Sequence, residues 1–317
     1  MKISVDDGHH TPHVASIRLE HYDLDATFSC GQAFRWQKRG DAWEAVIHGR
    51  WVRLRQTGSC FAEAAVLGAP ASLPARSCLS NPPQGMAALP DSDWRWLSDY
   101  LRLDDDFAAI LATFPDDAPM RAAMKHCPGL RLLRQEPWEC LASFILSSTK
   151  QVAQIQQCVQ LLCERFGDAV PAPVESGKQF AFPGAARLAR ATEAELRECK
   201  MGFRAKYLRG AAALVASGDL DLEKIRTLPI EAAREQLMRC PGVGRKIADC
   251  ALLFSCGFEE AFPIDVWIER AVRVLFMRNR KVSRERMELF AAKHFGPHRG
   301  YAQQYLFHHL RTTKWRE

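Results

Sequence analysis

The order of hydrophobic and polar residues divides the chain into a short alternating part and a longer helical part. Between residues 15 and 58, apolar residues alternate loosely with polar ones, and turns such as Lys38-Arg39-Gly40-Asp41 separate the segments. This pattern is typical of an antiparallel meander, with strands expected within 16–25, 32–37, 43–48 and 51–56. From about residue 94 onward, apolar residues recur at helical spacing. We expect helices over 94–114, 137–145, 150–165, 231–239 and 267–276, and a further helix that begins at Lys246.

The pattern predicts an α+β protein in two parts. Residues 1–117 should form an N-terminal antiparallel β-sheet domain with an associated helix, and residues 118–317 an all-α core. Residues 66–92 are rich in Ala, Pro, Ser and Gly, so we expect a flexible loop there. No apolar run approaches the roughly 18–20 residues that a membrane span needs, and the first residues lack the apolar region of a secretory signal.

Positive charge is concentrated in the last third of the chain. The formal net charge is +6, but residues 1–199 carry 21 Lys and Arg against 24 Asp and Glu, whereas residues 200–317 carry 22 against 13. This asymmetry indicates a surface that binds a polyanion, with a merely solvated basic surface as the alternative. The eleven cysteines follow no disulfide spacing, which indicates reduced thiols in an intracellular protein.

The segment Pro241-Gly242-Val243-Gly244 lies between two helical stretches. The Cys240-Pro241 step should end the first helix, and the glycines allow a tight turn and the close approach of a ligand. Helix, PGVG turn and helix form the helix-hairpin-helix pattern, and residues 231–256 would make up this hairpin. Its turn directs backbone amides and the positive end of the second helix outward. The pattern therefore predicts a phosphate-binding turn.

Lys246 and Asp265 are the candidate catalytic residues. Lys246 lies in the first turn of the second helix, where the positive helix end and Arg245 both disfavour an ammonium group. An amine driven toward its neutral form is a nucleophile. Asp265 follows nineteen residues later, in Pro263-Ile264-Asp265-Val266, and is expected to cap the next helix. Each feature is common alone, but the combination is rare.

The combination resembles the helix-hairpin-helix Gly/Pro-Asp superfamily of DNA base-excision glycosylases. The resemblance implies that Lys246 attacks the sugar C1′ atom and that Asp265 assists. Two further stretches, Ser29-Cys30-Gly31-Gln32-Ala33-Phe34-Arg35-Trp36 and residues 126–141, are similar to the 8-oxoguanine DNA glycosylase/AP lyase family. In that family, the carbonyl group of the glycine at position 31 reads the N7 proton that 8-oxoguanine has and guanine lacks.

The same resemblance assigns the remaining residues of the base pocket. Gln303 and Phe307 are four residues apart, so they share a face of the C-terminal helix. In the family, this glutamine bonds the flipped base and this phenylalanine stacks on it. Cys250 corresponds to the residue on the other side of the base. An apolar pair at helical spacing is more often part of a core, but here all three positions match together.

The resemblance also implies contacts to the DNA strands. Phe203 corresponds to an aromatic wedge, with core packing at a helix start as the alternative, and Arg204 to a residue that contacts the orphaned cytosine. The family has an asparagine and an arginine where this chain has Thr149 and Gln154, which implies relaxed selectivity for the base opposite the lesion. The predicted DNA-contacting residues are Thr149, Gln154, Phe203, Arg204, Lys206, Gly242, Val243, Gly244, Arg245 and Trp267.

These features predict a bifunctional DNA glycosylase/AP lyase that flips 8-oxoguanine out of double-stranded DNA and forms a Schiff base. We expect a monomer that acts on DNA inside the cell, in the nucleus or the nucleoid, with no membrane partner. The sequence has no His, Asp and Glu cluster with metal-ligand spacing. We therefore expect no cofactor, although hairpin carbonyls would suit a structural monovalent cation.

Two alternatives stay open. The first is a related glycosylase with a different or broader lesion range. No cysteine follows Cys256, so the four-cysteine iron–sulfur loop of endonuclease III-like enzymes is absent, and the 3-methyladenine type lacks a lysine like Lys246. The second is a non-catalytic module that uses the hairpin only to bind phosphates. Such a module would need neither the lysine nor the aspartate.

Overall fold

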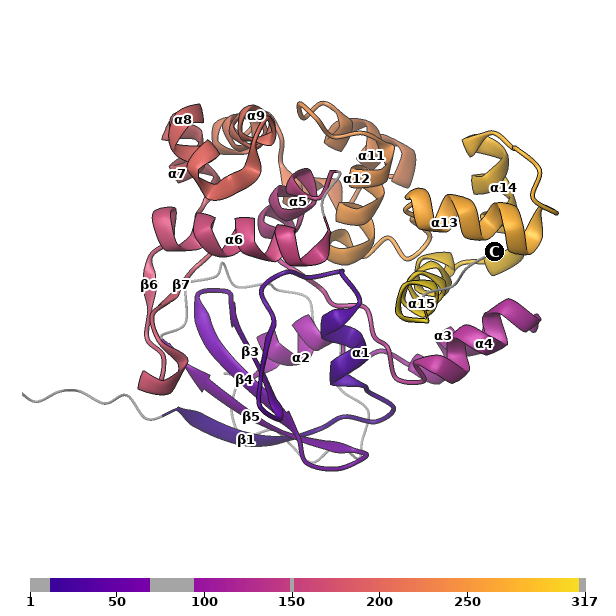
Figure 1. Cartoon of the computed structure of the whole chain (residues 1–317), viewed down its shortest axis with the longest axis horizontal. Coiled ribbons are helices and arrows are strands. Elements are labelled where there is room, and N and C mark those ends of the chain that lie inside the picture. Colours follow the sequence, from indigo (N-terminus) through magenta and orange to yellow (C-terminus); the bar gives the residue numbers. More distant parts are fainter. Residues whose placement is uncertain (1–11, 69–93, 149–150, 314–317) are drawn as a thin grey trace, which may run out of the picture.

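The computed structural model describes residues 12–68, 94–148 and 151–313. Thr149 and the predicted loop beyond residue 68 lie outside the described residues. A five-stranded sheet forms one layer, and most of the helices lie together above it (Figure 1). The predicted α+β class is therefore confirmed. None of the described helices combines the length and the apolar character that crossing a bilayer requires.

The sheet is formed by the strands β1 (His13–Arg18), β2 (Gln37–Arg39), β3 (Ala42–Ile47), β4 (Arg50–Gln56) and β5 (Phe61–Leu67). Its order is β1-β5-β4-β3-β2, and every neighbouring pair is antiparallel. A tight turn at His48-Gly49 joins β3 to β4, and their register places Trp43 opposite Leu54. The strands expected over 43–48 and 51–56 are thus confirmed.

Two strand predictions for this part of the chain need correction. The strand expected within 16–25 lies earlier, as β1 at His13–Arg18, because Leu24 already begins helix α1 (Leu24–Ser29). Residues 32–36 form no strand, because the chain leaves α1 as an irregular segment that buries Phe34 and enters β2 only at Gln37. The N-cap of α1 is Asp23, whose side chain accepts a hydrogen bond from Ala26 N at 2.9 Å. Strand β5 was not predicted, because its alanines have little intrinsic preference for strands. Pairing with β1 on one side and β4 on the other stabilises it.

The remaining elements are mostly helices. The first group is α2 (Arg95–Leu101), α3 (Phe107–Ala112), α4 (Ala118–His126), α5 (Pro137–Leu146) and α6 (Val152–Phe166). A small sheet of β6 (Ala169–Val170) and β7 (Gln179–Phe180) then encloses the 3-10 helix η1 (Val174–Ser176). The next group is α7 (Ala185–Arg190), α8 (Glu193–Leu196), the π-helical turn η2 (Arg197–Met201), α9 (Arg204–Ser217) and α10 (Leu222–Ile225).

The last group contains the predicted hairpin. It consists of α11 (Ile230–Met238), α12 (Arg245–Ala251) with its π-helical continuation η3 (Leu252–Cys256), α13 (Val266–Ala271) with η4 (Val272–Phe276), α14 (Arg284–Phe295) and α15 (Arg299–Thr312). The helices predicted at 137–145, 231–239 and 267–276 are confirmed to within a residue or two. The helix predicted over 94–114 is two helices, because Arg102 ends α2 in a left-handed conformation with a φ of 57°.

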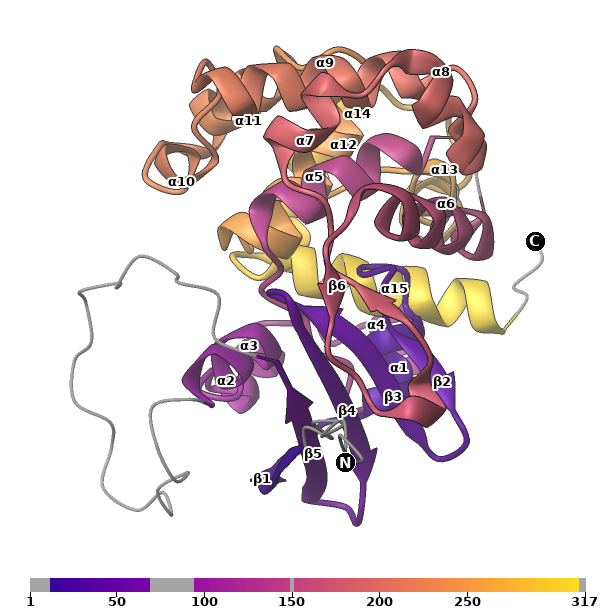
Figure 2. The ribbon, with the colours of Figure 1, turned by 90° about the vertical axis from the view of Figure 1, so that its left-hand side faces the viewer.

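The sheet and the helices have separate cores that meet beside α15. One face of the sheet packs on α2, and a larger core joins the helices. Cys30 and Phe34, although N-terminal, belong to the helical core. Helix α15 crosses between the sheet and the upper helices (Figure 2), and Tyr305 Oη donates a hydrogen bond to Leu130 O at 3.1 Å. The domain boundary at residue 117/118 stays a prediction. Phe107 of α3, which precedes this boundary, already packs in the helical core.

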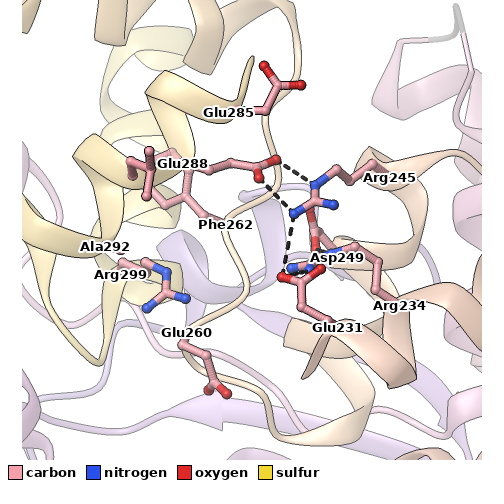
Figure 3. Close-up of a pocket in the computed structure, with 11 residues that line it drawn as sticks. Glu231, Arg234, Arg245, Asp249, Glu260, Phe262, Glu285, Glu288, Ala292 and Arg299 are labelled. Atoms are coloured by element: carbon pink, nitrogen blue, oxygen red, sulfur yellow. Dashed lines mark hydrogen bonds and ion pairs between the residues drawn. The ribbon is translucent and has the colours of Figure 1, made fainter. Parts of the chain in front are cut away.

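One face of α12 is held by ion pairs with neighbouring helices (Figure 3). Arg234 of α11 and Asp249 of α12 have side chains that are 6% and 2% exposed, and the Arg234 Nε and Asp249 Oδ1 atoms lie 2.7 Å apart. Arg245 donates two hydrogen bonds to the Glu288 carboxylate of α14, at 2.6 and 2.7 Å. These pairs line a charged cavity of about 360 Å³. Because burying a charge without a partner is costly, they fix the orientation of α12.

We predict that Asp249→Leu lowers the free energy of unfolding by about 3 kcal/mol, because it leaves the Arg234 guanidinium buried with only the exposed Glu231 as partner. Adding Arg234→Met should restore at least half of this loss, since an apolar pair needs no ionic partner. Chemical denaturation of both variants measures the effect. As a control, Glu193→Ala, which removes an exposed pair with Arg197, should cost less than about 0.5 kcal/mol. Equal losses in the single and double variants would contradict the prediction.

Candidate active site

The hairpin turn between α11 and α12 requires glycine at position 242. Gly242 has a φ of +78°, and a Cβ atom there would lie 2.5 Å from the ring of Tyr207. Gly242 and Gly244 are exposed, and their amides donate no hydrogen bond to any described residue. Together with the first amides of α12, they form an exposed edge of free amide groups where the sequence predicts phosphate binding.

The Val243 amide does not belong to this edge. Val243 N donates to Cys240 O at 3.0 Å within the turn, and the valine side chain is buried in the helical core. The amide is therefore engaged within the turn, and a DNA contact of Val243 stays a prediction. A four-residue turn closes through such an internal hydrogen bond, and the sequence alone does not say which of its amides is used.

Lys246 lies on the face of α12 opposite the ion pairs. Its Nζ donates to Ser147 Oγ at 3.3 Å and lies 5.3 Å from the centre of the Phe144 ring. Cys250, one turn further along the helix, lines the same pocket, and burial raises the pKa of its thiol to about 12, which the neighbouring Lys246 opposes. Ser147, at the end of α5, was not recognised from the sequence as a partner of the lysine. The adjacent pair Ser147-Ser148 was the only available signal.

Arg245 does not act on Lys246 as the sequence suggested. Its guanidinium points into the charged cavity on the other side of α12 and is neutralised by Glu288 (Figure 3). The half-buried Lys246 amine is therefore surrounded by an aromatic ring, a hydroxyl and a thiol rather than by a second cation. The sequence predicts that the amine is affected by Arg245 and by the positive end of α12. Only the second of these lies on the side of Lys246.

Asp265 caps α13, as predicted. Its Oδ1 atom accepts hydrogen bonds from Trp267 N at 3.0 Å and Ile268 N at 2.8 Å. Burial raises the pKa of the Asp265 carboxyl group above its ordinary value, and the two amides and the positive charge of Lys246 oppose this rise. The carboxylate is thus held by two backbone amides at a partly buried position, where a fixed charge acts more strongly than in bulk water.

One pocket brings together both candidate catalytic residues and all four predicted base-pocket residues. It is lined by Gly31, Phe144, Lys246, Cys250, Phe254, Pro263, Asp265, Gln303, Gln304 and Phe307. The Gln303 side chain is 4% exposed, and its Oε1 atom has no hydrogen-bond partner among the described residues. A buried, unpaired amide oxygen is costly, so it is available to a ligand. The cavity measures about 50 Å³, room for only a few waters, so a base would have to displace side chains.

The structure separates the two residues that were assigned to the wedge and the cytosine contact. Phe203 precedes α9 and is 51% exposed, so the alternative of core packing is wrong. Arg204 is buried: its guanidinium donates to the backbone oxygens of Met201 and Ser148, and it lies 4.4 Å from the Phe203 ring. The arginine therefore packs against the phenylalanine ring. To reach a base it would have to break its hydrogen bonds to the backbone.

Gln154 has a structural role at the start of α6. Its Oε1 atom accepts a hydrogen bond from Gln151 N at 3.0 Å, and the two residues form a reciprocal capping box. The amide oxygen of Gln154 is therefore engaged in capping the helix. The other predicted contacts differ in exposure: Lys206 is exposed above the Tyr207 ring, and Trp267 is half-buried in the first turn of α13.

Comparisons with known proteins agree with this geometry. A model of the 8-oxoguanine DNA glycosylase N-terminal domain matches residues 15–141, and one of HhH-GPD superfamily base excision DNA repair proteins matches residues 142–297. An N-glycosylase/DNA lyase of Arabidopsis thaliana is 29% identical over 94% of this chain and 80% of its own length. A probable N-glycosylase/DNA lyase of Methanothermobacter thermautotrophicus is 32% identical over 63% of this chain and 70% of its own length.

A solved structure extends the similarity to the whole fold. The 8-oxoguanine glycosylase/lyase of Clostridium acetobutylicum, in complex with double-stranded DNA containing cytosine opposite 8-oxoguanine, superposes with a TM-score of 0.82. It is 27% identical, and the match covers 96% of this chain and 99% of the other. With the hairpin, the lysine and the aspartate in one pocket, the chain belongs to the 8-oxoguanine DNA glycosylase/AP lyase family of the helix-hairpin-helix Gly/Pro-Asp superfamily.

Proposed function

We propose that this protein is a bifunctional DNA glycosylase and AP lyase that excises 8-oxoguanine from duplex DNA in base-excision repair. The observation that carries the proposal is the convergence of Lys246 and Asp265 with Gly31, Gln303 and Phe307 in one pocket. These residues come from the N-terminal segment, the hairpin, the start of α13 and the C-terminal helix, and only the fold brings them together. A module that merely binds phosphates would need the hairpin but not the pocket.

The reaction begins with extrusion of the damaged nucleotide, because its base cannot be reached inside the stack. Extrusion costs a few kcal/mol, and contacts to the distorted duplex offset this cost. The exposed Phe203 ring is placed to fill the space that the base leaves, and the Gly242 and Gly244 amides are placed to bind a phosphate group. The Lys206 ammonium adds a positive charge beside the wedge.

The pocket then distinguishes the damaged base by hydrogen bonding. The Gly31 carbonyl accepts a hydrogen bond from the N7–H group of 8-oxoguanine. Guanine has a lone pair at N7, which would repel the carbonyl oxygen. The unpaired Gln303 side chain bonds the edge of the base, and Cys250 and Phe307 enclose its two faces. Sites that leave a buried polar group unpaired with the wrong substrate discriminate strongly.

The chemical steps use Lys246 and Asp265. The neutral Nζ atom forms a bond to C1′ while the bond from C1′ to the base breaks, and the base leaves with the electron pair and takes up a proton. Asp265 stabilises the positive charge that develops on the sugar. The sugar ring then opens to give a Schiff base between Nζ and C1′. Loss of a C2′ proton and cleavage of the C3′–O bond complete the β-elimination.

The same proposal covers the partners of the protein. Its substrate is double-stranded DNA with an oxidised guanine, it acts as a monomer, and it works in the compartment that holds the DNA. Every step above is assigned to side chains and backbone groups of the chain, so no cofactor is required. A monovalent cation on the hairpin carbonyls would have a structural role only.

We predict that Lys246→Gln abolishes covalent trapping by borohydride and lowers base excision by roughly three orders of magnitude or more, because the nucleophile is lost. The measurement is single-turnover excision from an 8-oxoguanine duplex, together with trapping on the same DNA. Lys224→Gln is the matched control, since Lys224 is an exposed lysine on α10. It should leave both readouts unchanged. Robust trapping in Lys246→Gln would refute the assignment of the nucleophile.

Asp265→Asn should slow excision by about a hundredfold or more while DNA affinity changes less than about threefold, because asparagine can still cap α13 but carries no charge. Protonation removes the same charge in the wild type. Its activity should therefore fall as the pH drops through the raised pKa of Asp265, and the variant should lack this acidic limb. Parallel pH–rate profiles and binding titrations test this. Equal losses in rate and affinity would make Asp265 only a helix cap.

Selectivity for the opposite base should be weak, because Gln154 caps α6 and Arg204 is bonded beneath Phe203. We expect excision of 8-oxoguanine opposite C, T, G and A to differ by no more than about tenfold, the worth of roughly one hydrogen bond. Single-turnover rates on four otherwise identical duplexes give the comparison. A preference for cytosine above about a hundredfold would show that another residue reads the opposite base.

A further inference from the structure

The Gly31 carbonyl lies in a turn whose neighbouring carbonyls are both engaged by buried glutamines. Cys30 O accepts a hydrogen bond from Gln304 Nε2 at 2.9 Å, and Gln32 O accepts one from Gln135 Nε2 at 2.7 Å. The Gly31 oxygen between them accepts no hydrogen bond from any described residue, although Gly31 lines the pocket. Of three successive carbonyls, the two outer ones are therefore held and the middle one is left for a ligand.

The side chain of Gln32 fixes the turn from a third direction. It is completely buried, and its Nε2 atom donates to Thr27 O at 3.0 Å and to Arg131 O at 2.7 Å. Its Oε1 atom accepts from Leu133 N at 2.8 Å. Gly31 itself has a φ of +82°, a conformation that glycine adopts without strain. The residues on both sides of the Gly31 carbonyl are thus held by hydrogen bonds of their backbone oxygens and of the Gln32 side chain, which limits the movement of the turn.

The two glutamines also connect the turn to the other parts of the site. Gln304 follows Gln303 on α15, so the residue that bonds the base and the residue that holds the turn share one rigid helix. Gln135 N donates to Phe254 O at 2.9 Å, and Phe254 lines the pocket in η3, the continuation of the helix that carries Lys246. The Gly31 carbonyl is therefore fixed relative to both Gln303 and Lys246.

We propose that Gln304 and Gln135 are positioning residues that set the direction of the Gly31 carbonyl and thereby the selectivity for the damaged base. The inference rests on the proposed function, in which this carbonyl meets the N–H group of the lesion. The carbonyl attracts the N7–H group of 8-oxoguanine and repels the N7 lone pair of guanine. It can distinguish the two bases only if it keeps its direction when either base is in the pocket. A binding group that is misplaced by about 1 Å loses much of its contribution to recognition. The hydrogen bonds of Gln304 and Gln135, the two clamp residues, are therefore needed as well as the carbonyl itself.

The test compares two reactions of one protein. Gln304→Met and Gln135→Met keep the side-chain volume and remove the hydrogen bond, which leaves a buried carbonyl without a donor. Each variant is assayed for excision of 8-oxoguanine and for strand cleavage at a preformed abasic site in the same duplex. Abasic cleavage needs Lys246 but no base in the pocket. We expect excision to fall tenfold or more in both variants, with abasic cleavage within threefold of the wild type.

A matched control is Gln179→Met. Gln179 Nε2 donates to Ser176 O at 2.7 Å in the small sheet, far along the chain from the pocket residues, so both reactions should keep their wild-type rates. If either clamp variant loses the two activities in equal proportion, or loses neither, the inference is overturned. If the wild type cleaves abasic sites but does not release 8-oxoguanine, the proposed lesion is wrong instead. The two failures are therefore distinguishable.

Discussion

The position of Lys246, the proposed nucleophile, depends on another face of its own helix. Helix α12 carries Lys246 and Cys250 on one side and Arg245 and Asp249 on the other. The second pair is tied to α11 and α14 by ion pairs that cannot be broken without leaving a buried charge unpaired. Rotation of α12 by even a fraction of a turn would separate these charges. The same constraint thus holds the nucleophile against the pocket and directs Arg245 away from it.

Hydrogen bonding of buried polar groups assembles the rest of the pocket. The segment around Gly31 comes from the N-terminal domain, yet it is bonded to α15 through Gln304 and to the irregular segment before α5 through Gln135. Pairing of buried groups is close to obligatory in folded proteins, so these bonds determine how the two parts of the chain meet. Gln303 Oε1 is one of several buried polar atoms of α15 without a hydrogen-bond partner among the described residues, and Gln303 lines the pocket.

Much of the fold and of the site followed from sequence, but for different reasons. Some features depend only on the local spacing of residues and can be recognised in the sequence. They are the hairpin, the cap at Asp265 and the shared face of Gln303 and Phe307. Ser147 and Gln304 contact the site through tertiary packing, and no local pattern indicates such a contact. Strand β5 shows the same limit, because its alanines become a strand only between two partners.

The residues proposed for base excision and those predicted to face the opposite base lie on different elements. The pocket residues lie on α12, α13, α15 and the Gly31 turn, whereas Gln154 and Arg204 lie at the starts of α6 and α9 and are engaged in capping and backbone contacts. The two sets meet at the end of α5, where Ser147 Oγ accepts a hydrogen bond from Lys246 and Ser148 O accepts one from Arg204. Gln154 and its capping partner Gln151 do not line the pocket, so a contact at position 154 can be lost while the pocket stays intact. The capping bond of Gln154 stabilises the start of α6. The glutamine therefore has a structural role of its own at this position, where the family has an arginine.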